Sequence, residues 1–333
     1  MHPPKVQPGK LLPDKVRVRV PASTANLGPG FDTLGMALNL YTWIEMRASE
    51  QTVIRMEGPE LAGLPADKSN LVYKAAQLVF AEAGVSCPDL SIAMYSEIPM
   101  TRGLGSSASA IVGGLAAANA LIGRPLSNDR LFQIASRLEE HPDNVGASLF
   151  GGIVVAYWDG ERAEHIVLKP HERLEVLAVI PEFHLSTEKA RHALPERVPF
   201  RDAVFNVSHA AVLVAALAQG NLAMIRHAMK DALHQPYRAP LVPGMETILK
   251  EAPRYGALGA ALSGAGPTML ALVDRESGSR ESLESFMLDV FAREGIEARA
   301  MWLKPEAEGV QILTPLDEKC TLFEINAKGE SMK

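Results

Sequence analysis

EIPMTRGLGSSASAIVGGLAAAN, residues 97–119, is the stretch from which the organisation of this chain can be inferred. A glycine–serine loop leads into a run of small residues in which Ile111 and Leu115 are spaced as on one helical face. The first turn of a helix has unpaired backbone N–H groups and carries partial positive charge. The stretch therefore predicts a phosphate site at a helix start, and the hydroxyls of Ser106 and Ser107 favour this interpretation over a plain tight turn.

The composition indicates a folded enzyme that acts on a small molecule. The 333 residues are 47% hydrophobic and carry a net charge of −6, which argues against nucleic acid or an acidic membrane as the main partner. The N-terminal residues lack a signal-peptide core, and no apolar run is long enough to span a membrane. Cys87 and Cys320 are far apart and predict free thiols, with a single disulfide as the alternative. We expect a cytoplasmic enzyme.

Two domains are expected from the length, with a change of composition near residues 169–173. Residues 1–14 are rich in proline and lysine and predict a flexible arm. The boundaries that follow are an N-terminal domain at 15–170, a C-terminal domain at 171–317 and a tail at 318–333.

Alternating and helical hydrophobic patterns predict the elements of both halves. Strands are expected at 15–20, 38–46, 52–57, 90–98, 153–157, 165–168, 174–180, 269–273, 297–303 and 310–313. Helices are expected at 70–83, 107–121, 129–138, within 183–194, and at 201–219, 221–233, 243–251 and 282–294. Pro21 is expected to end the first strand, and residues 21–32 and 256–268 predict irregular loops rich in small residues.

Polar side chains gather in loops that could reach a ligand. Asn26 and Asp32 are the candidates in the first loop. His141, Asp143 and Asn144 lie beside a proline in the segment 139–152, where a solvated turn and a second polar loop of the site are equally good interpretations.

Two arginines in the second half are further candidates. Arg191 follows Thr187 by four residues, so both would share one face of a short capped helix, although a solvated surface arginine would produce the same pattern. Arg238 stands between prolines and is expected in a loop.

Three nucleotide-binding motifs compete for the glycine–serine loop. A Walker-type loop requires a lysine that is absent here. Gly103, Gly105 and Ala108 satisfy the letters of a dinucleotide fingerprint, but another helix follows before any strand and no suitable ribose-binding acid is present. The serine-containing loop of small-molecule kinases is the third candidate.

PMTRGLGSSAS resembles the P-x-x-x-G-L-G-S-S-A loop of the GHMP kinases. PASTANLGPGFD is similar to the first motif of that family and SGAGPT to its third, while HPDNVGASLFGG and STEKARHALP resemble segments of its homoserine-specific members. The resemblance covers roughly residues 15 to 315. It implies a two-domain α+β fold, with an N-terminal domain like one of a ribosomal small-subunit protein and containing a left-handed βαβ unit. The C-terminal domain would be ferredoxin-like, with ATP and substrate in the cleft between the two domains.

The resemblance also implies the reaction, which is transfer of the γ-phosphoryl group of ATP to the side-chain hydroxyl of L-homoserine with Mg²⁺, in threonine biosynthesis. ATP would be bound by Pro99, Met100, Thr101, Arg102, Gly103, Leu104, Gly105, Ser106, Ser107, Ala108 and Ser109. The substrate would be bound by Asn26, Asp32, His141, Thr187, Arg191, Arg238 and Gly264. Asp32 would hold the ammonium group and the two arginines the carboxylate, since a guanidinium can pair with both oxygens.

Catalytic and metal roles also come from the resemblance. Asn144 occupies a position where some relatives have an aspartate base, so we expect Asn144 to orient the hydroxyl near Thr187, with Asp143 as the neighbouring carboxylate. Some relatives have a metal-binding glutamate eight residues before the histidine, where this chain has Gln133. Glu139 and Glu140 are the nearby carboxylates, and we expect Glu139 with Ser106 as the magnesium ligands. A homodimer is implied by the resemblance.

Three alternatives stay open at this point. Another GHMP kinase acting on mevalonate or a related alcohol would share the loop. A non-enzymatic nucleotide-binding protein could share the N-terminal fold, although the acidic charge weighs against it. An NAD-dependent dehydrogenase is disfavoured by the missing acid.

Overall fold

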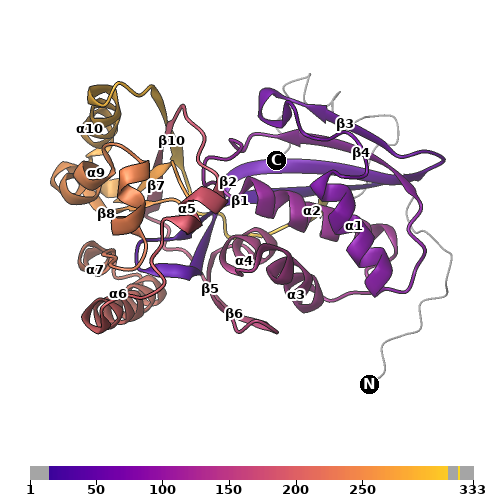
Figure 1. The fold of residues 1–333 in the computed structure, drawn as a ribbon, viewed down its shortest axis with the longest axis horizontal. Helices are drawn as coiled ribbons and strands as arrows, with labels where there is room; N and C mark the ends of the chain where they lie inside the picture. Colours follow the sequence, from indigo (N-terminus) through magenta and orange to yellow (C-terminus); the bar gives the residue numbers. More distant parts are fainter. Residues whose placement is uncertain (1–14, 314–321, 323–333) are drawn as a thin grey trace.

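The computed structural model describes residues 15–313 and residue 322. Two β-sheets, each covered by helices, form two bodies that lie side by side along the longest axis of the molecule (Figure 1). The predicted arm at 1–14, Cys320 and nearly all of the predicted tail lie outside the described residues.

The first body is a seven-stranded sheet covered by four helices. Strand order is β11-β1-β2-β4-β3, and the β5–β6 hairpin pairs with β2. The strands are β1 (Val16–Asn26), β2 (Gly30–Ser49), β3 (Val53–Glu57), β4 (Asp89–Ser96), β5 (Ile153–Trp158), β6 (Ala163–Leu168) and β11 (Gln311–Leu313). The helices are α1 (Leu71–Glu82), α2 (Ser106–Leu121), α3 (Asn128–Glu139) and α4 (Asp143–Phe150). Parallel β3 and β4 are joined through α1, which forms a βαβ unit, and β11 returns from the end of the chain to pair with β1.

The second body is an antiparallel four-stranded sheet of order β10-β7-β9-β8. Its strands are β7 (Leu174–Pro181), β8 (Ala257–Leu262), β9 (Met269–Asp274) and β10 (Ala298–Leu303). Its helices are α5 (Thr187–His192), α6 (Phe200–Gln219), α7 (Leu222–Ala228), α8 (Gln235–Arg238), α9 (Met245–Glu251) and α10 (Arg280–Arg293). Successive β7 side chains enter two separate cores, one with α6 and one with α10, so the strand is apolar along its length.

Helix α6 is long and apolar enough to cross a membrane by length and composition alone. Its inner side packs Leu213, Ala216 and Leu217 into the core beneath the second sheet. A core helix of a soluble protein passes the same test, so α6 is weak evidence for a membrane span.

Three predicted elements are wrong in extent. β1 continues through Pro21 to Asn26, because a shift of register at Pro21 accommodates the missing N–H, and the predicted loop 21–32 shrinks to three residues between β1 and β2. Residues 257–262 form β8, since their small side chains are buried in a central layer. α7 ends at Ala228 rather than Leu233.

Two predicted loops are helical. The segment expected as a polar turn or loop at 139–152 contains α4, which begins at Asp143 directly after Pro142. Arg238 lies in the single turn of α8, where the carboxylate of Asp231 accepts hydrogen bonds from the backbone N–H groups of His234 and Gln235 and so holds the turn.

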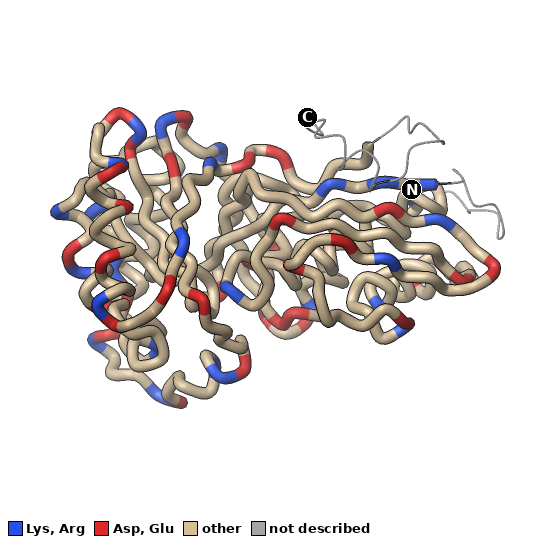
Figure 2. The backbone as a smooth tube through the Cα atoms, turned by 90° about the horizontal axis from the view of Figure 1, so that it is seen from above, with Lys and Arg blue, Asp and Glu red and all other residues tan. Residues whose placement is uncertain are grey.

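The charges of the described chain are interspersed. Lys and Arg positions and Asp and Glu positions are interspersed along the backbone of both bodies (Figure 2). Electrostatic recognition is therefore expected to be local, at individual sites.

Candidate active site

One pocket brings together segments of both bodies. All seven predicted substrate residues line it, which are Asn26, Asp32, His141, Thr187, Arg191, Arg238 and Gly264. Six of the predicted ATP residues also line it, which are Thr101, Gly103, Gly105, Ser106, Ser107 and Ala108. Glu139, Asp143 and Asn144 complete the predicted set. The expected phosphate end and the expected amino-acid end thus share one cavity.

The glycine loop needs its glycines for steric reasons. Gly103 and Gly105 have φ of 82° and 72°, which side chains disfavour. A Cβ on Gly103 would lie 2.2 Å from the carbonyl oxygen of Ser263, and one on Gly105 would lie 2.1 Å from the hydroxyl of Ser23. Gly105 is the N-cap of α2 and supplies no capping side chain, so the first-turn N–H groups of α2 stay available for an anion.

The other five predicted ATP residues do not line the pocket. Leu104 is in the core, and the buried hydroxyl of Ser109 donates to the carbonyl of Ser106. Arg102 contacts His184 and Glu182, and the N–H of Met100 donates to Glu60. Pro99 is also buried. These five residues therefore contact other parts of the protein and hold the loop in place.

At the amino-acid end, Arg191 and Asp32 form a two-pronged ion pair with N–O distances of 3.0 and 2.9 Å. Asn26 accepts the backbone N–H of Asp32 through Oδ1 and donates through Nδ2 to the carbonyl of Gly264, both at 3.0 Å. Asp32 and Asn26 both have positive φ, a conformation held here by these bonds. Asn26 therefore shapes the loop that presents Asp32.

Arg238 is 2% exposed and yet lines the pocket. Its Nε donates to the carbonyl of Ala190 and its Nη1 to the carbonyl of Gly264, each at 3.1 Å. Burial, reinforced by the nearby charge of Arg191, lowers the pKa of Arg238 to about 10, so the guanidinium is still a cation at neutral pH. The ring of Phe31 faces both guanidinium groups, 5.7 Å from Arg191 and 5.1 Å from Arg238.

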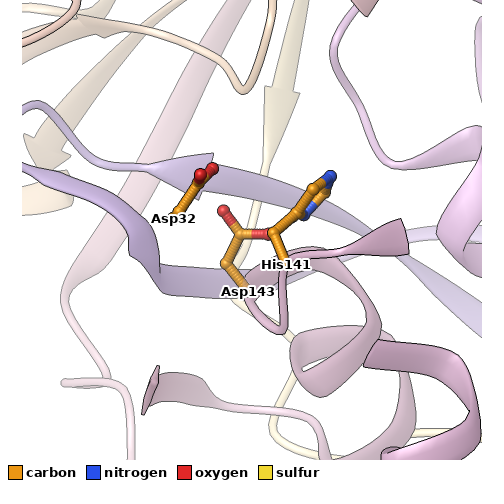
Figure 3. Close-up of side chains that lie close together, drawn as sticks. All are labelled: Asp32, His141 and Asp143. Atoms are coloured by element: carbon orange, nitrogen blue, oxygen red, sulfur yellow. The ribbon is translucent and has the colours of Figure 1, made fainter. Parts of the chain in front are cut away.

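His141, Asp143 and Asp32 converge at the centre of the pocket (Figure 3). His141 Nδ1 lies 2.7 Å from Asp143 Oδ1, and its Nε2 lies 3.7 Å from Glu139. Burial acts to lower the pKa of His141, but the carboxylates of Asp143, Asp32 and Glu139 outweigh it and raise that pKa to about 9. The imidazole is therefore cationic at neutral pH, so ion pairs with these carboxylates stabilise the cluster.

Asn144 lies in the first turn of α4, next to this network. Its Oδ1 accepts a hydrogen bond of 3.0 Å from the hydroxyl of Ser23, and its backbone N–H donates to Asp143. Its side chain is thereby held in the pocket between the glycine loop and the acidic cluster.

Comparison with known proteins agrees with this geometry. The models named GHMP kinases N terminal domain and GHMP kinases C terminal match residues 70–152 and 213–286. Homoserine kinase of Deinococcus radiodurans is 48% identical, covering 89% of this chain and 96% of that protein, and homoserine kinase of Desulfitobacterium hafniense is 43% identical, covering 90% and 100%. This chain belongs to the homoserine kinase family of the GHMP kinases.

Solved structures agree with that assignment. The crystal structure of homoserine kinase from Cytophaga hutchinsonii has a TM-score of 0.81 and 27% identity, covering 92% of this chain and 99% of that one. Mevalonate kinase of L. major has a TM-score of 0.67 at 20% identity, which shows the shared fold alone. The two-domain GHMP kinase fold is confirmed, and the dehydrogenase alternative is wrong.

The predicted magnesium ligands fit the donor set that a homoserine kinase would offer. Glu139 is the last residue of α3, and its Oε1 accepts a hydrogen bond of 2.7 Å from the hydroxyl of Ser107, beside Ser106. Glu139 lines the pocket, whereas neighbouring Glu140 does not. A carboxylate and serine hydroxyls next to an anion-binding loop are the hard oxygen ligands that Mg²⁺ prefers.

Sequence reasoning missed two residues of the site. Phe31 lines the pocket between the arginines, and Ser23 holds Asn144 and contacts the glycine loop. Both lie in the segment at 21–32 that was singled out for its polar residues. Its density of special-geometry residues was a usable signal, but only the fold shows which side of the segment faces the cavity.

Proposed function

We propose that this chain transfers the γ-phosphoryl group of ATP to the side-chain hydroxyl of L-homoserine and yields O-phospho-L-homoserine, a step of threonine biosynthesis. The observation that carries the proposal is a single pocket with two chemically different ends. One end is a helix start without a capping side chain, and its loop packs against Ser23 and Ser263 so closely that only glycine fits at 103 and 105. The other end has paired guanidinium and carboxylate groups, which suit a zwitterion.

Recognition of homoserine would exploit the ion pair of Asp32 and Arg191. A substrate ammonium would take Asp32 as its partner, and the substrate carboxylate would take Arg191 together with Arg238. The substrate would thus replace the ion pair between Asp32 and Arg191 with two ion pairs, one at its ammonium group and one at its carboxylate. These two pairs offset the loss of the pair within the protein. Mevalonate has a carboxylate but no ammonium group, so it would provide no cationic partner for Asp32.

The chemical step would depend on positioning and on neutralising charge, as is general for phosphoryl transfer. Asn144 is held by Ser23 and would orient the reacting hydroxyl, together with Thr187, which lines the same pocket. Asp143 is already engaged by His141 and by the N–H of Asn144, which disfavours it as a proton acceptor. When bound, Mg²⁺ would neutralise the triphosphate charge, held by Glu139 and Ser106.

We also propose that the enzyme is a cytoplasmic homodimer with no nucleic-acid or membrane partner. Interspersed charges on both bodies support the absence of an extended polyanion-binding surface (Figure 2). Light scattering coupled to size exclusion tests the dimer, and a mass of about 36 kDa would refute it because that is the mass of one chain.

An ADP-release assay with ATP tests the reaction. Homoserine, mevalonate, serine and threonine are offered in parallel at equal concentration. We expect turnover with homoserine and little with the others. Turnover of mevalonate without turnover of homoserine would refute the substrate, and ATP binding without any ADP release would favour a nucleotide-binding protein instead.

A further inference from the structure

His234 is a buried side chain that the proposed reaction does not use directly. It is 0% exposed and lies immediately before α8, four residues ahead of Arg238. Its Nε2 is 2.8 Å from the carbonyl oxygen of Gly28, and its Nδ1 is 3.3 Å from Nη1 of Arg238. Since a carbonyl only accepts, Nε2 carries the proton and Nδ1 is free to accept from Arg238. The imidazole therefore bridges the first motif and the guanidinium group.

The surroundings hold this imidazole in one orientation. Asp231 accepts the backbone N–H groups of Leu233, His234 and Gln235 and so fixes the turn that carries the ring. Phe31 stacks on the ring of His234 at 5.0 Å. Burial lowers the pKa of His234, which keeps the ring neutral at pH 7, as an acceptor for a guanidinium must be.

The hydrogen bonds of Arg238 explain why this contact matters. Nε donates to Ala190, and the two hydrogens of Nη1 go to Gly264 and His234. Of the three guanidinium nitrogens of Arg238, only Nη2 has no hydrogen-bond partner among the described residues. The Arg238 side chain also lines the pocket. The three internal bonds thus define the plane in which Nη2 is presented to a ligand.

We propose that His234 is a positioning residue that aims Arg238 at the carboxylate of the substrate. This inference rests on the proposed function, because it assumes that Arg238 binds that carboxylate. The contact at Nδ1 sets the rotation of the guanidinium group, and the contact at Nε2 ties that rotation to the loop that carries Phe31 and Asp32. His234 acts through Arg238 and does not touch the substrate.

A matched pair of variants separates the two ring nitrogens. In His234→Asn the amide oxygen occupies the place of Nδ1 and can accept from Arg238, whereas in His234→Gln the amide reaches the place of Nε2 and loses that contact. The measurement is kcat/KM for L-homoserine divided by kcat/KM for its primary amide, which lacks the carboxylate charge. This ratio does not depend on how much of each variant is folded. We expect His234→Gln to lower the ratio about tenfold, as the loss of one good hydrogen bond implies, and His234→Asn to keep it near that of the wild type.

Two controls make the outcome decisive. His227→Gln changes an exposed histidine of the preceding helix and should leave the ratio unchanged. Wild-type enzyme that fails to phosphorylate homoserine refutes the proposed function itself. The positioning role alone is refuted if the wild-type enzyme is active but the ratio for His234→Gln stays unchanged. It is also refuted if that ratio falls no further than the ratio for His234→Asn.

Discussion

The two ends of the pocket are built in different ways. The phosphate end comes from one contiguous loop, and its chemistry is that of backbone N–H groups at the start of α2. The amino-acid end comes from five segments far apart in the chain, and its chemistry is mainly that of ionised side chains, with Asp32 paired to Arg191 across 159 positions. A site made of backbone groups depends on steric fit, whereas a site made of charged side chains depends on charge balance. We therefore expect the phosphate end to be sensitive to added side-chain atoms and the amino-acid end to be sensitive to the removal of a charge.

A steric change at the phosphate end should impair the use of ATP. In Gly103→Ala the new Cβ would lie 2.2 Å from the carbonyl oxygen of Ser263, at a φ of 82°, so the loop must move. We expect kcat/KM for ATP to fall roughly 100-fold, since a displacement of about 1 Å is enough for such a loss. Gly63→Ala is a matched control, because its φ is 80° but no atom lies within 4 Å of the new Cβ. Equal losses in both variants would mean that backbone strain, not the close approach, is responsible.

Charge removal at the amino-acid end should affect one ligand only. Arg191→Ala should weaken homoserine binding by about 2–5 kcal/mol, the usual effect of truncating one partner of a charge pair, and should barely change ATP binding. Titration calorimetry with each ligand measures both affinities. Arg201→Ala, a change in a strongly exposed arginine of α6, is the control. If both ligands weakened equally, the role assigned to Arg191 would be wrong.

The same difference explains what the sequence alone could predict. The helix starts expected at 107, at 129 and within 183–194 depend on neighbours in the chain, and the structure places them at Ser106, Asn128 and Thr187, the last two capped by Ser127 and Ser186. The extension of β1 through Pro21 and the burial of Arg238 depend on partners that only the packed fold supplies. Local geometry was therefore predictable, and the extent of elements at the site was not.

The amino-acid end also shows why residue types were easier to predict than their contacts. Acidic and basic side chains in loops were recognisable as candidates to contact a ligand, and the family resemblance implied that this ligand is a zwitterion. His141 lies close to the carboxylates of Glu139 and Asp143 because the turn between α3 and α4, within the first body, brings these three residues together. The pairing of Arg191 with Asp32, by contrast, follows from the approach of the two bodies. No periodicity or spacing within one segment encodes such an approach.

Asp143→Asn tests whether the acidic cluster does chemistry or only balances charge. We expect turnover to persist with a loss of less than roughly 100-fold, because a general base contributes about 100- to 10,000-fold and Asp143 is engaged by His141. The measurement is kcat at saturating ATP and homoserine, with thermal unfolding to show that the fold is intact. Complete loss of turnover in a folded variant would identify Asp143 as the base and overturn the role proposed for Asn144.

The protonation of His141 should affect the stability of the fold, and the phosphate end has no counterpart to this effect. Its pKa is raised to about 9 in the folded state against 6.5 in the unfolded chain, because nearby carboxylates outweigh burial. The folded state therefore binds the proton more tightly, so this contribution to stability is complete below pH 6.5 and is lost as the pH rises through about 9. Relative to His141→Gln, the wild type should lose at most about 1.4 kcal/mol of unfolding free energy per pH unit in that window. Denaturant unfolding at pH 6, 7.5 and 9 measures the difference in unfolding free energy. If the unfolding free energies of the two proteins changed equally with pH, the His141 imidazole would be neutral in the folded state over this range.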